Sequence, residues 1–202
     1  GRLLATALSR FAPIPTTSGW ATYLRCHDDI GWAIDDADAA AIGLNGALHR
    51  EFCASFYANE FPESFARGVH FQSNPATGDR RTSGSAASLI GIEAALEQKD
   101  FAALDRAIER LTCAYAMVFG FGGLPLLYMG DELGLLNDKT FLANPTKKDD
   151  NRWIHRPEMR WDLVDNPNEA ISARVFSAIE NLIKVRKQMP ALHAAVNTEA
   201  FT

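Results

Sequence analysis

The sequence predicts an α/β fold with parallel strands. Two short segments, residues 20–26 and 124–129, have the composition of strands. The second is almost wholly apolar, which is typical of a strand buried on both faces. Segments with helical periodicity lie between and after them, and strands that alternate with helices usually lie parallel in one sheet. Only two strands are visible, however, and two parallel strands cannot form a closed sheet.

The chain is expected to begin with a helix and then a strand. Residues 3–11 have a helical pattern, which Pro13 and Pro15 cannot continue. The strand at 20–26 is rich in aromatic and other strand-favouring residues. Because the sequence opens on a helical pattern and has no initial Met, we expect it to be a piece of a longer protein.

Between Asp29 and about Ser83 there is no long periodic segment. We expect short helices at 36–42 and 49–57, followed by an irregular stretch rich in Gly, Pro and Asn over 68–79. Such a long insertion is usually functional or disordered. A folded subdomain is favoured by its aromatic residues, which are Phe52, Phe56, Tyr57, Phe61, Phe65 and Phe71.

Three longer helices are expected in the second half of the chain. The first begins at the Ser-Gly-Ser cap of residues 83–85 and runs to about Gln98. The second begins at Asp100, which is a good N-cap residue, and runs to Phe119, where a glycine-rich segment ends it. The third, after the second strand and a polar loop, covers roughly residues 169–188.

The composition is that of an ordinary globular protein, with 47% apolar and 22% charged residues. The net charge of −5 and the scattered Lys and Arg residues argue against nucleic acid as a partner. There is no 18-residue apolar run and no signal peptide, so we expect no membrane segment. Cys26, Cys53 and Cys113 are widely spaced, which favours free thiols in a reducing compartment and a cytoplasmic location.

His27, Asp28 and Asp29 are the most informative polar residues because they directly follow the first strand. In barrels of parallel strands, catalytic side chains lie at this end of a strand. A structural reading has one carboxylate capping a turn and a partly buried histidine. A metal site needs more ligands than the other histidines are spaced to supply, so no metal is expected. A third reading is sugar chemistry, in which carboxylates stabilise an oxocarbenium-like transition state.

The segment Arg25–Trp32, RCHDDIGW, resembles the strand-seven motif of the α-amylase superfamily of glycoside hydrolases. The doubled Asp before Ile-Gly-Trp is especially similar to the amylosucrases of that superfamily. The resemblance covers about residues 19–190. Four further segments resemble amylosucrases in the same order, namely FARG at 65–68, NPATGDRR at 74–81, GGLPLLYMGDE at 122–132 and DDNRWIHRP at 149–157.

This resemblance implies that the chain is the C-terminal portion of a (β/α)8 TIM barrel, comprising strands seven and eight with their helices. It also implies an inserted subdomain after strand seven. Residues 1–28 would be the end of helix six and strand seven. Residues 29–83 would be the inserted subdomain that shapes the acceptor channel, and residues 84–202 the remaining barrel helices, strand eight and the C-terminal helix.

The resemblance also implies roles for individual residues. Asp28 matches the carboxylate that stabilises the transition state, and His27 matches a histidine that hydrogen-bonds the reacting glucosyl ring. Asp29 and Arg81 match residues that contact the fructosyl or acceptor sugar. Arg152 matches an arginine that pairs with a carboxylate to close the floor of the sucrose pocket. No metal or organic cofactor is implied.

Other residues keep alternative readings. Arg80 adjoins Arg81, so a shift of one residue would exchange their roles. Asp131 and Glu132 also follow a predicted strand, but structural hydrogen bonding is the favoured reading for them. Three aromatic residues could either stack on sugar rings or simply pack against the protein, namely Trp32, Phe71 and Trp153.

The strands that carry the nucleophile and the acid/base in this family have no counterpart in the sequence. Retaining cleavage needs two carboxyl groups about 5 Å apart, so we expect the isolated chain to be inactive and to pair with the missing N-terminal part of the barrel. The complete protein is expected to cleave sucrose, release fructose and transfer glucose to an α-glucan acceptor or water. Sucrose hydrolase, trehalose synthase and α-glucosidase activities are alternatives, as is a catalytically silent carbohydrate-binding fragment.

Overall fold

The computed structural model describes residues 2–12, 14–15, 17–164, 166, 170–194 and 196. Pro13 and Glu169, which the sequence analysis places at helix boundaries, lie outside these residues. Among the helices described, none combines the length and the apolar character that a bilayer crossing needs.

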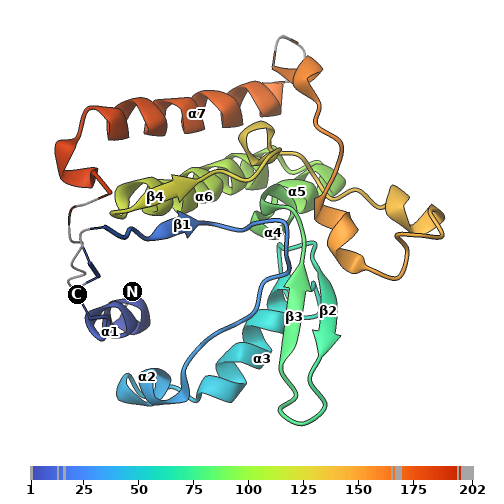
Figure 1. The fold of residues 1–202 in the computed structure, drawn as a ribbon. Helices are drawn as coiled ribbons and strands as arrows, with labels where there is room; N and C mark the ends of the chain where they lie inside the picture. The colour runs from blue at the N-terminus through green and yellow to red at the C-terminus, as the bar shows by residue number, and fades with distance from the viewer. Residues whose placement is uncertain are drawn as a thin grey trace.

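A parallel pair of strands joins two segments that lie far apart in the sequence. β1 (Ala21–Tyr23) pairs with β4 (Leu124–Leu126), and both are shorter than the strands predicted there. α6 (Phe101–Gly120) lies against one face of this pair, and α7 (Ala170–Lys187) packs on α6 (Figure 1). The predicted parallel arrangement of the two strands is therefore present, whereas the barrel stays a prediction.

The main core lies between α6, α7 and two shorter helices, α4 (Ala86–Ile90) and α5 (Ile92–Gln98). As predicted, Asp100 is the N-cap of α6, and its side chain accepts a hydrogen bond from the Ala103 backbone N–H at 2.9 Å. Buried apolar side chains from all four helices meet here, among them Ala87, Ile92, Leu111, Tyr115, Val175 and Ile179.

The predicted helix over 83–98 is wrong in one respect, because the structure divides it into α4 and α5. Gly91 separates them with a φ of +107°, a left-handed conformation that ends the first helix. The N-cap is as expected, since the Ser85 side chain accepts a hydrogen bond from the Ser88 N–H at 3.2 Å. Helical periodicity alone does not reveal such a break.

A second group of elements lies below this core in Figure 1 and contains α2 (Asp36–Ala41) and α3 (Gly46–Tyr57), which confirm the two predicted short helices. An antiparallel hairpin, β2 (Val69–Ser73) with β3 (Arg80–Ser83), lies beside α3. Aromatic rings pack between α3 and the loop that follows it, with centroids 5.0 to 6.2 Å apart; they belong to Phe52, Phe56, Phe61 and Phe65.

The hairpin corrects the expectation of an irregular stretch over 68–79. The Gly, Pro and Asn residues fall mainly in the turn, where Asn74 N–H donates to the Asp79 carbonyl at 2.8 Å. The strands themselves contain Val, His, Phe and Thr. Averaging over the whole stretch therefore hid two short strands.

The remaining elements are short and lie close to the chain ends or between β4 and α7. α1 (Arg2–Ser9) occupies the region of the predicted first helix. The described chain also contains 3₁₀ turns, which are η1 (Asp131–Leu133), η2 (Thr140–Ala143), η3 (Asn151–His155), η4 (Trp161–Leu163) and η5 (Pro190–Leu192).

Candidate functional site

Asp28 lies five residues after the end of β1, where it is held by Arg152 of η3. Arg152 Nη1 donates to Asp28 Oδ1 at 3.0 Å, and the Asp29 backbone N–H donates to the same oxygen at 3.0 Å. The guanidinium and these hydrogen bonds keep the pKa of the Asp28 carboxyl well below its usual range. Since 45% of the Asp28 side chain is exposed, a charged carboxylate remains accessible to a ligand.

Arg152 joins Asp28 to a second carboxylate, Asp150. Arg152 Nε and Nη2 donate to the two Asp150 oxygens, each at 2.9 Å, in the forked geometry that suits a guanidinium. The Phe71 ring lies 5.0 Å from the guanidinium carbon. One cation is thus shared by two acids, so the group as a whole carries a net negative charge.

Asp29 has a very different environment from its neighbour. Only 2% of its side chain is exposed, and its Oδ2 accepts a hydrogen bond from Arg81 Nη1 at 3.2 Å. Among the described residues, its buried Oδ1 has no hydrogen-bond partner. Burial, together with the adjacent Asp28, raises the pKa of the Asp29 carboxyl.

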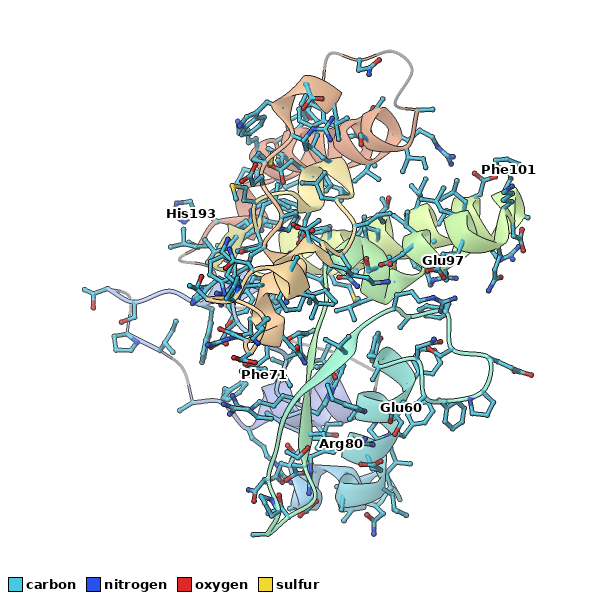
Figure 2. The ribbon with its side chains drawn as sticks, turned by 90° about the vertical axis from the view of Figure 1, so that its right-hand side faces the viewer. Glu60, Phe71, Arg80, Glu97, Phe101 and His193 are labelled. Atoms are coloured by element: carbon cyan, nitrogen blue, oxygen red, sulfur yellow. The ribbon has the colours of Figure 1, made fainter. Side chains whose placement is uncertain are left out.

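Arg80 and Arg81 are separated by the alternation of side chains along β3. Arg81 extends toward Asp29, whereas Arg80 is directed to α3 and the loop after it. There it contacts Glu51, donates to Ser55 Oγ at 2.9 Å and pairs with Glu60 at 3.1 Å (Figure 2). The structure therefore places Arg81, and not Arg80, beside Asp29.

The His27 side chain lies at the surface, whereas its backbone carbonyl is hydrogen-bonded to other residues. The residue is exposed, and its imidazole has no hydrogen-bond partner among the described residues. Its carbonyl accepts from Arg156 Nε at 2.8 Å, from Arg156 Nη2 at 2.6 Å and from His155 Nε2 at 3.2 Å. The main chain next to Asp28 is therefore firmly held while the imidazole is free to meet a ligand.

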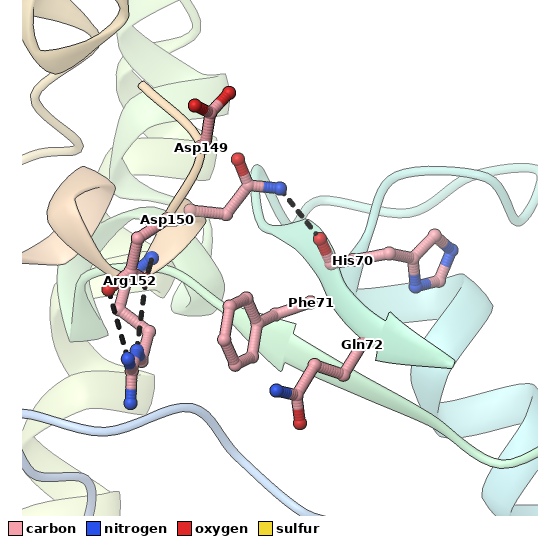
Figure 3. A pocket seen from close by; sticks show the side chains of 7 residues that line it. His70, Phe71, Gln72, Asp149, Asp150 and Arg152 are labelled. Atoms are coloured by element: carbon pink, nitrogen blue, oxygen red, sulfur yellow. Dashed lines mark hydrogen bonds and ion pairs between the residues drawn. The ribbon is translucent and has the colours of Figure 1, made fainter. Parts of the chain in front are cut away.

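An open pocket of about 420 Å³ lies against Arg152, between the hairpin and η3. Figure 3 shows Phe71 and Arg152 facing this space, with Asn151 Nδ2 donating to the His70 carbonyl at 2.9 Å. Mostly polar side chains line the pocket, which suits a hydrogen-bonding ligand better than an apolar one. The full lining is His70, Phe71, Gln72, Asp149, Asp150, Asn151 and Arg152.

Sequence reasoning assigned a role to Arg152 in this lining but missed Asp150 and Gln72. The run Asp149-Asp150-Asn151-Arg152 was a usable signal, because four polar residues in succession need a hydrogen-bonding environment. Gln72 offered no such signal, since a single polar residue in a strand is ordinary.

Asp131 is buried, and its side chain is hydrogen-bonded to other protein side chains. It is 1% exposed, and it accepts hydrogen bonds from Arg25 Nε at 3.2 Å and from the Tyr115 hydroxyl. Burial beside this carboxyl raises the pKa of Tyr115 far above its usual range. Asp131 therefore ties the segment after β1 to α6 rather than facing the pocket.

Two of the aromatic residues considered for sugar stacking are occupied by protein contacts. Trp32 stacks on Tyr57 with ring centroids 5.0 Å apart and donates from Nε1 to Thr82 Oγ1 at 3.1 Å. Trp153 lies under the Lys147 ammonium at 4.0 Å. Phe71 alone of the three lines the pocket.

No cluster of three or more His, Cys, Asp or Glu side chains that could hold a metal ion occurs within the described ranges. In comparison with known proteins, no family model matches the chain.

Proposed function

We propose that this chain supplies the transition-state-stabilising and sugar-binding side of a retaining, amylosucrase-like active site. The observation that carries the proposal is the accessible Asp28 carboxylate, five residues after the parallel strand β1 ends, kept charged by Arg152. The ordered motifs that resemble amylosucrases supply the substrate class, which is sucrose as donor and an α-glucan or water as acceptor.

Cleavage of a glycosidic bond generates positive charge at the anomeric carbon, and a fixed carboxylate nearby lowers the energy of that state. Asp28 fits this role because its charge is already present before the substrate binds. The exposed His27 imidazole lies on the adjacent residue and can donate a hydrogen bond to a ring hydroxyl.

Asp29 and Arg81 fit a role in holding the fructosyl or acceptor sugar. The Asp29 side chain is only 2% exposed, so its part is to orient Arg81 through the 3.2 Å hydrogen bond that Oδ2 accepts. Arg81 is 54% exposed and keeps further N–H groups available for a second hydroxyl.

The nucleophile and the acid/base are proposed to come from other strands of the same barrel. Asp150 and Asp29, the other carboxyl groups near Asp28, each already pair with an arginine, so neither is a free nucleophile. In the complete reaction, a carboxylate would displace fructose to form a glucosyl ester, and the acceptor or water would then displace that carboxylate. All three cysteines are free thiols, in keeping with the proposed cytoplasmic location.

The test is release of fructose from sucrose by the natural full-length polypeptide, with the 202-residue chain assayed beside it. Release by the full-length polypeptide alone supports the proposal. Release by the 202-residue chain means that the nucleophile has been misplaced, and no release by a folded full-length protein rejects sucrose as the substrate. The partition of glucose among water, glucan and an isomeric disaccharide then separates the hydrolase, transferase and isomerase alternatives.

A further inference from the structure

His155 lies in the interior, directly behind the candidate site, and both of its ring nitrogens are engaged. The residue is 1% exposed. Its Nδ1 lies 3.2 Å from the Gly84 backbone nitrogen, and its Nε2 lies 3.2 Å from the His27 carbonyl oxygen. The imidazole thus bridges the start of the α4 segment to the residue that precedes Asp28.

These two contacts require one particular protonation state. The Gly84 N–H can only donate, so Nδ1 must be the unprotonated nitrogen, and the His27 carbonyl can only accept, so Nε2 must carry the proton. Protonation of Nδ1 would set two N–H groups against each other. Burial, together with the neighbouring Arg25, lowers the pKa of His155 to about 4, so the imidazole is neutral at physiological pH.

The η3 turn holds the His27–Asp28 dipeptide at two separate points. Arg152, at the start of the turn, binds the Asp28 carboxylate, and His155, at its end, binds the His27 carbonyl. The turn itself is anchored, because Arg25 Nη2 donates to the His155 carbonyl at 3.3 Å and pairs with buried Asp131 at 3.2 Å. Together these contacts fix both the main chain and the side chain of the predicted catalytic aspartate.

We infer that His155 is a positioning residue, whose Nε2–H holds the His27 carbonyl and thereby fixes the Asp28 carboxylate against Arg152. The effect of His155 on turnover rests on the proposed function, whereas the effect of His155 on the geometry of Asp28 does not. If His155 were only a structural core residue, losing the contact of either ring nitrogen would destabilise the fold without a specific effect on Asp28. A positioning histidine acts on Asp28 through the donor nitrogen only.

The charged groups around His155 are Arg25, Arg156, Asp28 and Asp131. Arg25 and Arg156 oppose protonation of the imidazole, and Asp28 favours it. Asp131 is engaged by Arg25 and Tyr115. Arg156 also donates to the His27 carbonyl, but from an exposed position, where hydrogen bonds compete with water. Of these two donors, His155 is the one whose residue is almost fully buried.

The first measurement needs no substitution. Nitrogen-15 NMR of the folded chain with labelled histidine reports the tautomer of each imidazole. We expect His155 to be the neutral Nε2–H form and to stay so between pH 5.5 and 8, in line with a pKa of about 4. An Nδ1–H tautomer, or titration near the usual histidine value, would overturn the inference whether or not any variant folds.

The second measurement compares His155→Gln with His155→Asn. The Gln amide nitrogen takes approximately the place of Nε2 and keeps the donor to His27, whereas the Asn amide oxygen takes the place of Nδ1 and keeps only the acceptor for Gly84. Carbon-13 NMR of the side-chain carboxyl gives the pKa of Asp28 in each folded variant. We expect that pKa to rise toward its ordinary range in the Asn variant and to stay low in the Gln variant. Equal behaviour of the two variants, with both folded, contradicts the inference.

Turnover by the full-length polypeptide supplies an independent readout. We expect kcat for fructose release to fall on the order of 10- to 100-fold in the Asn variant, with a much smaller loss in the Gln variant. If no form of the protein releases fructose, the proposed function fails, but the tautomer and the Asp28 titration still decide the role of His155.

Discussion

Asp28 and Asp29 are adjacent in sequence, yet their side chains have opposite electrostatic environments. Asp28 is half-exposed and hydrogen-bonded to a guanidinium, while Asp29 is buried with one oxygen unpartnered among the described residues. The pKa of Asp28 is therefore lowered and that of Asp29 is raised. Two carboxyl groups with such different proton affinities are suited to different tasks, one as a fixed charge and the other as a hydrogen-bonding group that can take up a proton.

The substitution Asp28→Asn tests the fixed charge. It keeps the size and one acceptor oxygen but removes the negative charge, so we expect kcat for fructose release by the full-length polypeptide to fall at least on the order of 10²- to 10³-fold. The fold should persist, because the side chain is 45% exposed and Arg152 keeps Asp150. Steady-state kinetics and circular dichroism measure the two effects.

Asp105→Asn is the matched control for that substitution. Asp105 is also an exposed aspartate paired with an arginine, with Arg174 at 2.8 Å and 60% of the Asp105 side chain exposed. Removing the Asp105 charge should leave kcat for fructose release unchanged. Near-normal turnover in Asp28→Asn, or an equal loss in both variants, would remove Asp28 from the mechanism.

Asp29→Asn tests the buried carboxyl through stability. Because burial raises its pKa, the folded chain binds this proton more tightly than the unfolded chain does. The resulting stabilisation is present below the unfolded pKa of about 4 and is lost as the pH rises through the folded value. The variant should therefore gain stability relative to the natural chain as the pH increases from 4 to 7.

Thermal unfolding of both chains at pH 4 and pH 7 measures this gain. The variant keeps a side-chain oxygen that can accept from Arg81, which is 54% exposed, so the change in this contact should not reverse the sign. If Asp29→Asn loses stability with rising pH, Asp29 is an ordinary ionised aspartate.

At the residue scale, the resemblance singled out Asp28, Asp29, Arg81 and Arg152, but the sequence did not reveal every contact among their neighbours. The structure brings Asp28 to Arg152 and Asp29 to Arg81 across long sequence separations, as hydrogen-bonded pairs. Asp150 was missed because an acid two residues before an arginine is common in turns. His155 was missed because no local pattern reveals that a polar residue will be 1% exposed.

At the element scale, local signals with a strong physical cause were reliable. Asp100 and Ser85 cap their helices as predicted, because short polar side chains satisfy the first free N–H groups of a helix. The break at Gly91 was not predictable, since glycine is tolerated inside a helix and only tertiary packing decides its backbone conformation.

Gly91→Ala tests the break between α4 and α5. At a φ of +107°, a side chain is strained, and an added Cβ would meet the Phe65 ring at 3.2 Å and Arg110 Nη2 at 2.8 Å. We expect a loss of about 1 to 3 kcal/mol, which lowers the melting temperature by several degrees. Calorimetry of the two chains measures the difference.

Gly120→Ala is the control for this substitution. Gly120 is the last residue of α6, and an added Cβ there meets nothing within 4 Å. Alanine is the better helix former, so stability should be unchanged or slightly higher. A similar loss in both variants would show that glycine flexibility, and not the strained conformation of Gly91, matters.

At the scale of the whole molecule, the described residues cover the parallel pair of β1 and β4 on one face only. Thr22 and Pro125 are partly buried, and Thr22 Oγ1 donates to the Val118 carbonyl of α6 at 3.4 Å. On the other face, Tyr23 and Leu126 are each 50% exposed. Parallel sheets are normally covered on both faces, so this face has the character of a core surface. The proposed further strands of a barrel would cover it.

This uncovered face predicts that the 202-residue chain associates as its concentration rises. Tyr23, Leu124 and Leu126 are 50%, 58% and 50% exposed on the two paired strands, and neighbouring apolar side chains of this kind drive association in water. Leu126→Lys should reduce that association, because burying the ammonium in a contact is unfavourable. Its melting temperature should change little, since the side chain already faces solvent. Sedimentation velocity over a range of concentrations measures the effect.

Phe101→Lys is the matched control, because Phe101 is 76% exposed but lies at the start of α6, at the outer end of that helix in Figure 2. It removes an isolated apolar side chain, and isolated apolar residues are normal on protein surfaces. We expect its sedimentation to match that of the natural chain. If both lysine variants reduce association equally, general surface hydrophobicity is the cause. If the natural chain stays monomeric at every concentration, the β1–β4 face does not need a cover, and the argument for further strands beside it loses its physical support.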